Sequence, residues 1–139
     1  MLVLLARLCC GLFAGAALYI AIVQQPAARA AGDDVAGRLF TPMYRRAAPV
    51  QAGLATVGTL AGIGAWLVGE GLAYLAGAAL LGSVVPLTLA VIRPVNERLM
   101  GSRLDPGSVE TQALLTLWNR LHGLRTALGM LAYVAYLAG

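Results

Sequence analysis

Nearly unbroken apolar runs, each about as long as a membrane-spanning helix, are the feature that most constrains this chain. Three of them cover residues 2–23, 50–69 and 72–92. The hydrocarbon core of a bilayer is about 30 Å thick, and an α-helix that rises about 1.5 Å per residue crosses it in about 20 residues. A fourth segment, 109–138, has the length of a span, although its uninterrupted apolar part begins only at Thr126. The runs predict an all-α integral membrane protein built as a four-helix bundle.

Composition agrees with one membrane-embedded unit. Apolar residues make up 60% of the chain and charged residues only 12%, a balance that excludes an ordinary soluble domain. We therefore expect residues 1–139 to form a single transmembrane domain in contact with the lipid bilayer.

Positive charge is concentrated in the first and third connections between these runs. The basic residues there are all arginine: Arg29, Arg38, Arg45 and Arg46 in the first, and Arg93, Arg98 and Arg103 in the third. Arginine in such connections sets membrane orientation, so it does not imply a nucleic-acid partner. The pattern predicts a protein of the cytoplasmic membrane with both termini outside the cytoplasm.

The first connection is polar but carries apolar residues at helical spacing, including Val35, Leu39 and Phe40. This spacing predicts a short amphipathic helix on the membrane surface, with Asp33 or Asp34 as its cap. Pro42 is expected to end or bend that helix.

The other connections and the small residues add two further expectations. Little more than Gly69, Glu70 and Gly71 joins the second and third spans, which predicts a tight hairpin. Small-x-x-x-small spacing at 11–15 and 58–62 favours close helix packing and leaves open a homodimer formed through glycine-rich helix faces. Glycine is also common in membrane helices without any such role.

The only histidine lies in the fourth segment and shares a helix face with other polar side chains. At about 100° per residue, Trp118, His122 and Arg125 fall within a wedge of about 60°, and Tyr136 extends the same stripe. Arginine and histidine inside a membrane cost a few kcal/mol unless they face a bundle interior or a wet cavity, so they usually mark a site. The alternative is that they lie at the headgroup level, with the arginine extended toward water and the tryptophan as an interfacial anchor.

A second polar group follows the third span on the same membrane side. Asn96 and Arg98 are placed to close over the helix-four stripe, or else to cap the third helix and contact phosphates. Histidine and carboxylate spacings typical of metal sites are missing from the sequence, so we predict no metal.

Two motifs give this chain a family resemblance. Residues 94–99 (PVNERL) and 118–125 (WNRLHGLR) resemble the anthrone oxygenase-like membrane proteins, which are small four-span bundles, many of them bacterial and without an assigned function. Known members oxidise an anthrone to an anthraquinone with O2 and without a dedicated metal or flavin. The resemblance therefore implies a cofactor-independent, monooxygenase-like oxidoreductase acting on a lipophilic phenolic or polycyclic aromatic molecule.

The same resemblance implies roles for the residues above. His122 would remove a proton from an acidic carbon, and the resulting enolate would be stabilised by Arg125, Asn96 and Arg98. A flat aromatic substrate would stack on Trp118 and Tyr136.

Two other functions remain open at this stage. The first is a haem-binding membrane protein in which His122 is an axial ligand and an arginine meets the propionates. The second is a non-enzymatic accessory or scaffold subunit, in which arginines bind anionic lipid and glycine faces bind partner helices.

Overall fold

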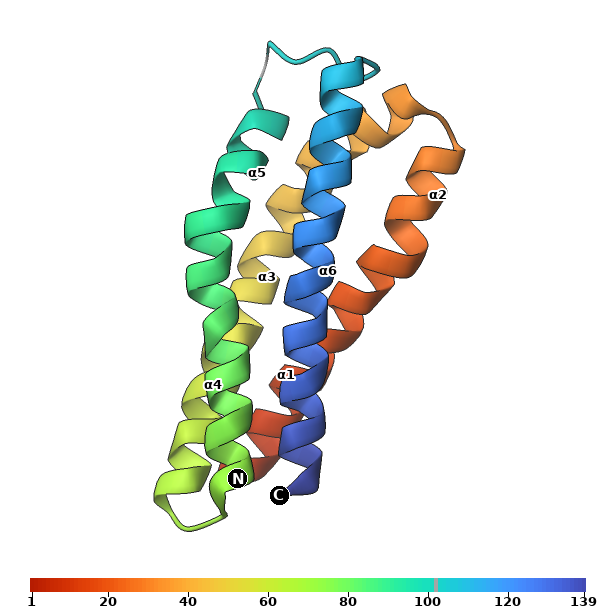
Figure 1. The fold of residues 1–139 in the computed structure, drawn as a ribbon. Coiled ribbons are helices and arrows are strands. Elements are labelled where there is room, and N and C mark those ends of the chain that lie inside the picture. Colours follow the sequence, from red (N-terminus) through yellow and green to blue (C-terminus); the bar gives the residue numbers. More distant parts are fainter. Residues whose placement is uncertain (102) are drawn as a thin grey trace.

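Four helical rods lie side by side in the computed structural model, which describes residues 1–101 and 103–139 (Figure 1). The first rod comprises α1 (Leu2–Tyr19), the π-helical turn η1 (Ile20–Gln24) and α2 (Gln25–Ala30). The second is α3 (Asp33–Leu67), and the third comprises α4 (Leu72–Leu87), the π-helical turn η2 (Thr88–Ile92) and α5 (Arg93–Leu99). The fourth is α6 (Val109–Ala138). The described residues contain no strand, which confirms the all-α prediction.

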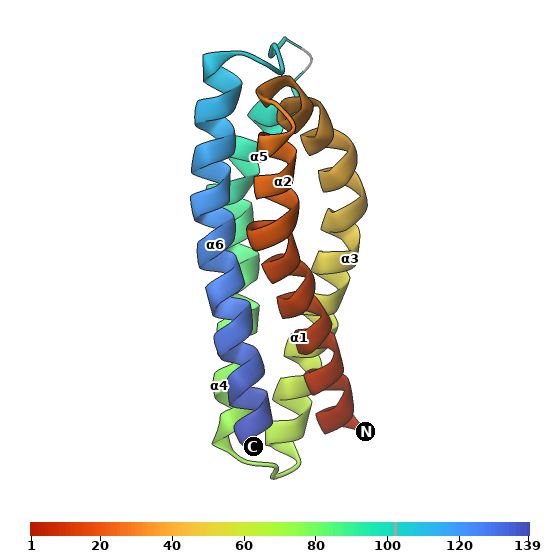
Figure 2. The ribbon, with the colours of Figure 1, turned by 90° about the vertical axis from the view of Figure 1, so that its right-hand side faces the viewer.

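Neighbouring rods run in opposite directions around a shared interior. Both α1 and α4 pack against α3 on one side and α6 on the other. The chain termini and the α3–α4 turn lie at one end, and the arginine-rich connections lie at the other (Figures 1 and 2).

Three of these rods are long and apolar enough to cross a membrane: Leu2–Ala30, Asp33–Leu67 and Leu72–Leu99. Large apolar side chains also cover their outward faces, including Leu12, Leu60 and Leu89. Exposed apolar surface on this scale is unusual for a soluble monomer and marks contact with a membrane or a partner. These features indicate a membrane protein.

The segment expected to form a separate surface helix is instead the first part of α3. The helix begins at Asp33, after Gly32 with φ of 127°, and continues through Pro42 and Pro49. A proline inside a helix removes one hydrogen bond and crowds one carbonyl. Here the cost is offset because Phe40 is buried in the interior. The expectation of a short surface helix is therefore wrong: of the apolar residues that suggested it, Phe40 packs on protein, whereas Val35 and Leu39 stay exposed.

The α3–α4 connection confirms the predicted tight hairpin. Gly69 and Gly71 both have positive φ, at 95° and 107°, and only glycine adopts this region without a steric penalty.

Prolines also explain the two π-helical turns. Pro26 and Pro94 each follow a turn closely, and neither can donate to the carbonyl four residues earlier. The chain widens there, so the amide of Gln25 donates to Ile20 and the amide of Arg93 donates to Thr88. Such turns are frequent at functional sites, and both adjoin the cavities described below.

The glycines at 58 and 62 make room for a side chain of their own chain. Tyr136 is fully buried and donates a hydrogen bond to the Gly58 carbonyl at 3.0 Å. A β-carbon at Gly62 would overlap the Tyr136 phenol, and one at Gly77 would lie 2.6 Å from its ring. Gly62 and Gly77 therefore form a socket for Tyr136 inside the bundle, and Gly58 supplies the carbonyl that accepts its hydrogen bond.

Candidate functional site

An aromatic cluster holds the single histidine in the interior. His122 is 2% exposed, and its ring stacks on that of Trp118 with centroids 4.7 Å apart and planes within 8°. The two residues are four apart on α6, where side chains lie one above the other. Phe40 from α3 packs edge-on against Trp118 at 5.3 Å. The indole of Trp118 thus fixes one face of the imidazole, and Phe40 of α3 fixes the indole.

The hydrogen bond of His122 defines which ring nitrogen is available for chemistry. Its Nε2 lies 3.0 Å from the carbonyl oxygen of Ala17 on α1. A carbonyl only accepts, so in the neutral ring Nε2 carries the proton and Nδ1 holds the free lone pair. The candidate base is therefore Nδ1.

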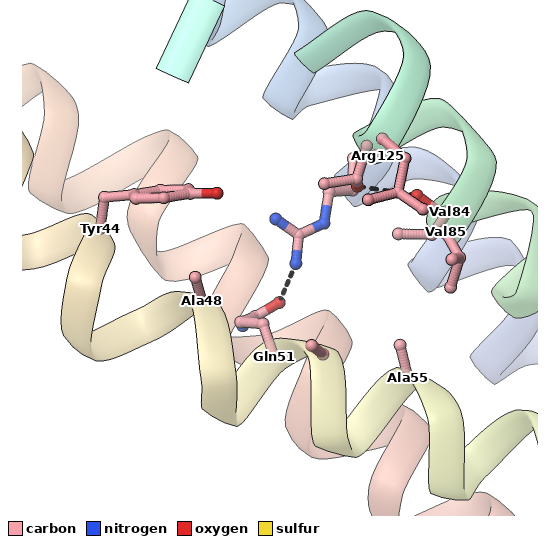
Figure 3. Close-up of a pocket in the computed structure, with 10 residues that line it drawn as sticks. Tyr44, Ala48, Gln51, Ala55, Val84, Val85 and Arg125 are labelled. Carbon is pink, nitrogen blue, oxygen red and sulfur yellow. Dashed lines mark hydrogen bonds between the residues drawn. The ribbon is translucent and has the colours of Figure 1, made fainter. Parts of the chain in front are cut away.

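Arg125 lies one turn further along α6 and has no acidic partner. Its Nη2 donates to Oε1 of Gln51 on α3 at 2.8 Å (Figure 3), and its guanidinium lies over the Phe13 ring at 5.0 Å. Its Nε is buried without a hydrogen-bond partner. Within residues 1–101 and 103–139, every ion pair involves other arginines. The guanidinium is therefore an uncompensated cation in apolar surroundings, an arrangement suited to an anion.

Asn96 holds the cluster from the side of α5. It is 1% exposed, and its Oδ1 accepts a hydrogen bond from Nε1 of Trp118 at 2.7 Å. Its Nδ2 is buried and has no partner. Asn96 thus orients the indole that supports His122.

Two neighbouring cavities meet at the Arg125–Gln51 hydrogen bond. A small void of about 20 Å³ is lined by Trp118 and His122 as well as by this pair. A larger pocket of about 120 Å³ lies between α3 and α4–η2, with Arg125, Gln51 and Tyr44 at its polar end (Figure 3). His122 lines the void and not the larger pocket.

The remaining two sequence-predicted site residues lie elsewhere. Arg98 is exposed on α5 and pairs with Glu110 at 2.9 Å. Tyr136 is on the same stripe as His122 but is 14 residues further along α6, or about 21 Å at about 1.5 Å per residue. Neither side chain belongs to the cluster.

Sequence reasoning missed Gln51, which is 3% exposed and lines both cavities. The available signal was its polarity, because an amide inside a long apolar run needs an internal partner. Tyr44, which also lines both cavities, projects from α3 toward the guanidinium (Figure 3).

The cluster does not fit a haem. The void beside His122 has room for about one water molecule, and the imidazole is already held by Trp118 and the Ala17 carbonyl. In the described part of the chain, no group of three or more histidine, cysteine, aspartate or glutamate residues is placed to hold a metal ion.

Comparison with protein families gives one match. The model described as anthrone oxygenase matches residues 40–135, which is more than half of the chain. The matched range contains Tyr44, Gln51, Asn96, Trp118, His122 and Arg125. No match was found among curated proteins or among solved structures.

Proposed function

Because this chain belongs to the anthrone oxygenase family, we propose that it is a membrane-embedded oxygenase that oxidises a lipophilic phenolic or polycyclic aromatic molecule with O2. The observation that carries the proposal is the pairing of an oriented imidazole with a guanidinium that has no acidic partner, at the junction of two cavities. Deprotonation and stabilisation of the resulting anion require these two groups.

The proposed reaction begins with a methylene carbon that is acidic because it is conjugated, through the fused rings, with a ketone oxygen, as in anthrone. His122 accepts a proton at Nδ1, through one water molecule that fits the small void. The electron pair of the broken C–H bond moves onto the ring oxygen as an enolate. The electron-rich carbon then reduces O2 and forms a C–O bond, and the hydroperoxide loses water to leave a carbonyl. In total, one CH2 group and one O2 give one C=O group and one H2O.

Arg125 is the group that stabilises the enolate. Its charge has no carboxylate to neutralise it, and Gln51 satisfies only one of its donors. A preorganised cation in a site that excludes water stabilises developing negative charge strongly. Asn96 acts through Trp118 on the ring of His122, so it is a positioning residue.

The proposed location is the cytoplasmic membrane, with both termini outside the cytoplasm. All the arginine-rich connections lie at the end opposite the termini, which supports this orientation (Figure 1). His122 lies about midway along α6, 16 residues before its end, or about 24 Å. A hydrocarbon core about 30 Å thick that starts at the C-terminal end of α6 extends past the level of His122. A substrate dissolved in the bilayer is therefore at the depth of the site.

The test is O2 consumption by the detergent-purified protein with anthrone as substrate. His122→Gln keeps an Nε2 donor for the Ala17 carbonyl but lacks the base, so it should fold and lose activity by at least a hundredfold. Arg120→Gln is the matched control on the same helix, because Arg120 is exposed. An active His122→Gln variant would refute the proposed base, and a parent protein that consumes no O2 would favour a non-enzymatic accessory subunit. A Soret band that disappears in His122→Ala would instead establish haem.

A further inference from the structure

The pocket between α3 and α4–η2 contacts the cation of the site but not its base. Its volume is about 120 Å³, and small or apolar side chains such as Ala52, Ala55 and Val84 line it. The guanidinium of Arg125 lies at its polar end (Figure 3), whereas His122 lines only the neighbouring void. The pocket therefore adjoins the proposed chemistry without containing the group that removes the proton.

The volume of this pocket decides which reactant it can hold. An apolar cavity of about 150 Å³ takes one benzene ring or xenon. A substrate of three fused rings, such as anthrone, is therefore too large for a pocket of about 120 Å³. Dioxygen is an apolar molecule of two atoms and fits. Of the two reactants in the proposed reaction, only O2 matches the pocket.

The mouth of the pocket opens on the apolar outside of the bundle. Ala52, Val85 and Leu89 line the pocket and are themselves exposed. All three lie in rods that are long and apolar enough to cross a membrane. Because O2 is apolar, it partitions from water into hydrocarbon. The pocket is thus open to the O2 that is dissolved in the bilayer.

The other side of the pocket leads toward His122. Tyr44, Ala48, Gln51 and Arg125 line both the pocket and the small void beside the imidazole. The two spaces are therefore neighbours. O2 that moves from the pocket past Arg125 enters the space in which the base acts.

The position of Arg125 also suits the charge that forms when O2 is reduced. One electron passes from the enolate to O2, which gives a carbon radical and a superoxide anion. These combine to form the C–O bond of a peroxide anion, and the imidazolium of His122 returns its proton to give the hydroperoxide. The negative charge thus moves from the enolate to the reduced oxygen. Arg125 lines both spaces, and it has no acidic partner among the described residues, so it stabilises the charge in either place.

A second opening on the other side of α3 is less suited to O2 reduction. This groove of about 440 Å³ lies between α1–η1 and α3 and is bordered by Ala16, Gln24 and Arg46. Gln51 lines it too, but Arg125 does not. A superoxide anion formed in the groove would be separated from the buried guanidinium by Gln51.

We propose that the pocket between α3 and α4–η2 is the O2 site of this protein, that it fills from the bilayer, and that the aromatic substrate stays outside it. The proposal rests on the proposed function. It makes Ala52, at the mouth, and Ala55, which is 2% exposed, residues that control access of O2 and not affinity for the aromatic molecule.

The first experiment locates O2 without turnover. O2 is paramagnetic and speeds the relaxation of nuclei that it approaches, so methyl NMR of the protein in lipid nanodiscs is compared under pressurised O2 and N2. Val84 lines the pocket and is 2% exposed, and Leu81, one turn earlier on α4, is fully buried and does not line it. The relaxation enhancement at Val84 should be at least about threefold that at Leu81. Ala52→Phe should lower the enhancement at Val84 to that at Leu81.

The second experiment measures O2 consumption with anthrone at varied concentrations of both. Ala52→Phe, and Ala55→Val as a smaller change deeper in the pocket, should each raise the KM for O2 at least about fivefold and leave the KM for anthrone within about twofold. Ala16→Phe adds bulk in the opposite groove, and Ala79→Phe adds it on the outside of α4. Both of these controls should keep the parent's KM for O2.

Xenon tests the same pocket in the unsubstituted protein. Apolar cavities of about this size bind it, so xenon should compete with O2 and raise the KM for O2 without raising the KM for anthrone. Helium at the same pressure is the control and should change neither value.

Four results would overturn the O2 site. They are equal relaxation enhancement at Val84 and Leu81, an unchanged KM for O2 in both Ala52→Phe and Ala55→Val, a rise in the KM for anthrone in place of that for O2, and an effect of Ala16→Phe as large as that of Ala52→Phe.

The two proposals fail in distinguishable ways. If Val84 reports O2 but the parent protein consumes none with anthrone, the O2 pocket stands and the oxygenase reaction fails. If the parent consumes O2 with anthrone but Val84 shows no more enhancement than Leu81, the reaction stands and this pocket is not its O2 site.

Discussion

Substitution of Gln51 by leucine or by glutamate should separate the stability of the bundle from the chemistry at Arg125. In the native structure Oε1 of Gln51 accepts from Nη2 of Arg125 at 2.8 Å, and its Nε2 makes a long contact of 3.5 Å with the Phe13 carbonyl. Leucine has a similar volume but removes the acceptor. Glutamate keeps an acceptor in the same place and adds a negative charge.

The magnitudes follow from the contacts of the guanidinium. A hydrogen bond to a charged group contributes about 1.5–3 kcal/mol, so Gln51→Leu should lower the free energy of unfolding by about 2 kcal/mol. Gln51→Glu forms a buried ion pair with Arg125, so it should fold at least as stably as Gln51→Leu. Gln51→Glu should also lose activity because its carboxylate neutralises Arg125, whereas Gln51→Leu leaves that cation free and should lose stability without a comparable loss of activity. The loss in Gln51→Glu should be about 10²–10³ in kcat, the usual effect of removing one preorganised oxyanion donor.

The decisive comparison is the glutamate variant, measured by thermal unfolding and by O2 consumption with anthrone. Neutralising Arg125 while keeping it in place removes its ability to stabilise an enolate. If Gln51→Glu is stable and fully active, the charge of Arg125 has no catalytic role and our reasoning is wrong. If only Gln51→Leu loses activity, Arg125 serves the packing of the bundle.

Three further substitutions test the supports of the site. Asn96→Leu leaves the indole N–H of Trp118 buried without an acceptor. It should lower the free energy of unfolding by about 1–3 kcal/mol, measured by thermal unfolding, and should lower kcat more than it raises KM. Gly62→Ala overlaps the Tyr136 phenol and should destabilise the bundle by about 1–3 kcal/mol, yet the folded fraction should turn over normally. Arg98→Gln removes an exposed ion pair, so it should change the free energy of unfolding by less than about 1 kcal/mol and leave activity unchanged. A large loss of activity would show that Arg98 does take part in the reaction.

Helical periodicity predicted the part of the site that lies on one helix. It placed Trp118, His122 and Arg125 on one face, and they line one void. The same angular argument included Tyr136, because an angle around the axis carries no information on height along it. Arg98 was included because it is close to Asn96 in sequence, although two residues correspond to about 200° around a helix.

The residues that α3 contributes to the site could not be derived from the sequence pattern of α6. The pairing of Gln51 with Arg125 joins residues 74 positions apart, and it depends on how two helices pack. The same limit explains the first connection, where the apolar spacing was visible but its packing partner was not. Phe40 lies against Trp118, a contact that local sequence does not encode.

The acceptor that holds His122 belongs to the main chain of α1. Every amino acid carries a backbone carbonyl, so no substitution at Ala17 can delete this acceptor. A larger side chain there, at a position that is fully buried, would instead push α1 away and lengthen the 3.0 Å contact. Which nitrogen of His122 carries the proton therefore depends on the spacing between two helices. Mutations that shift α1 by a fraction of an ångström should thus act like mutations of the histidine itself.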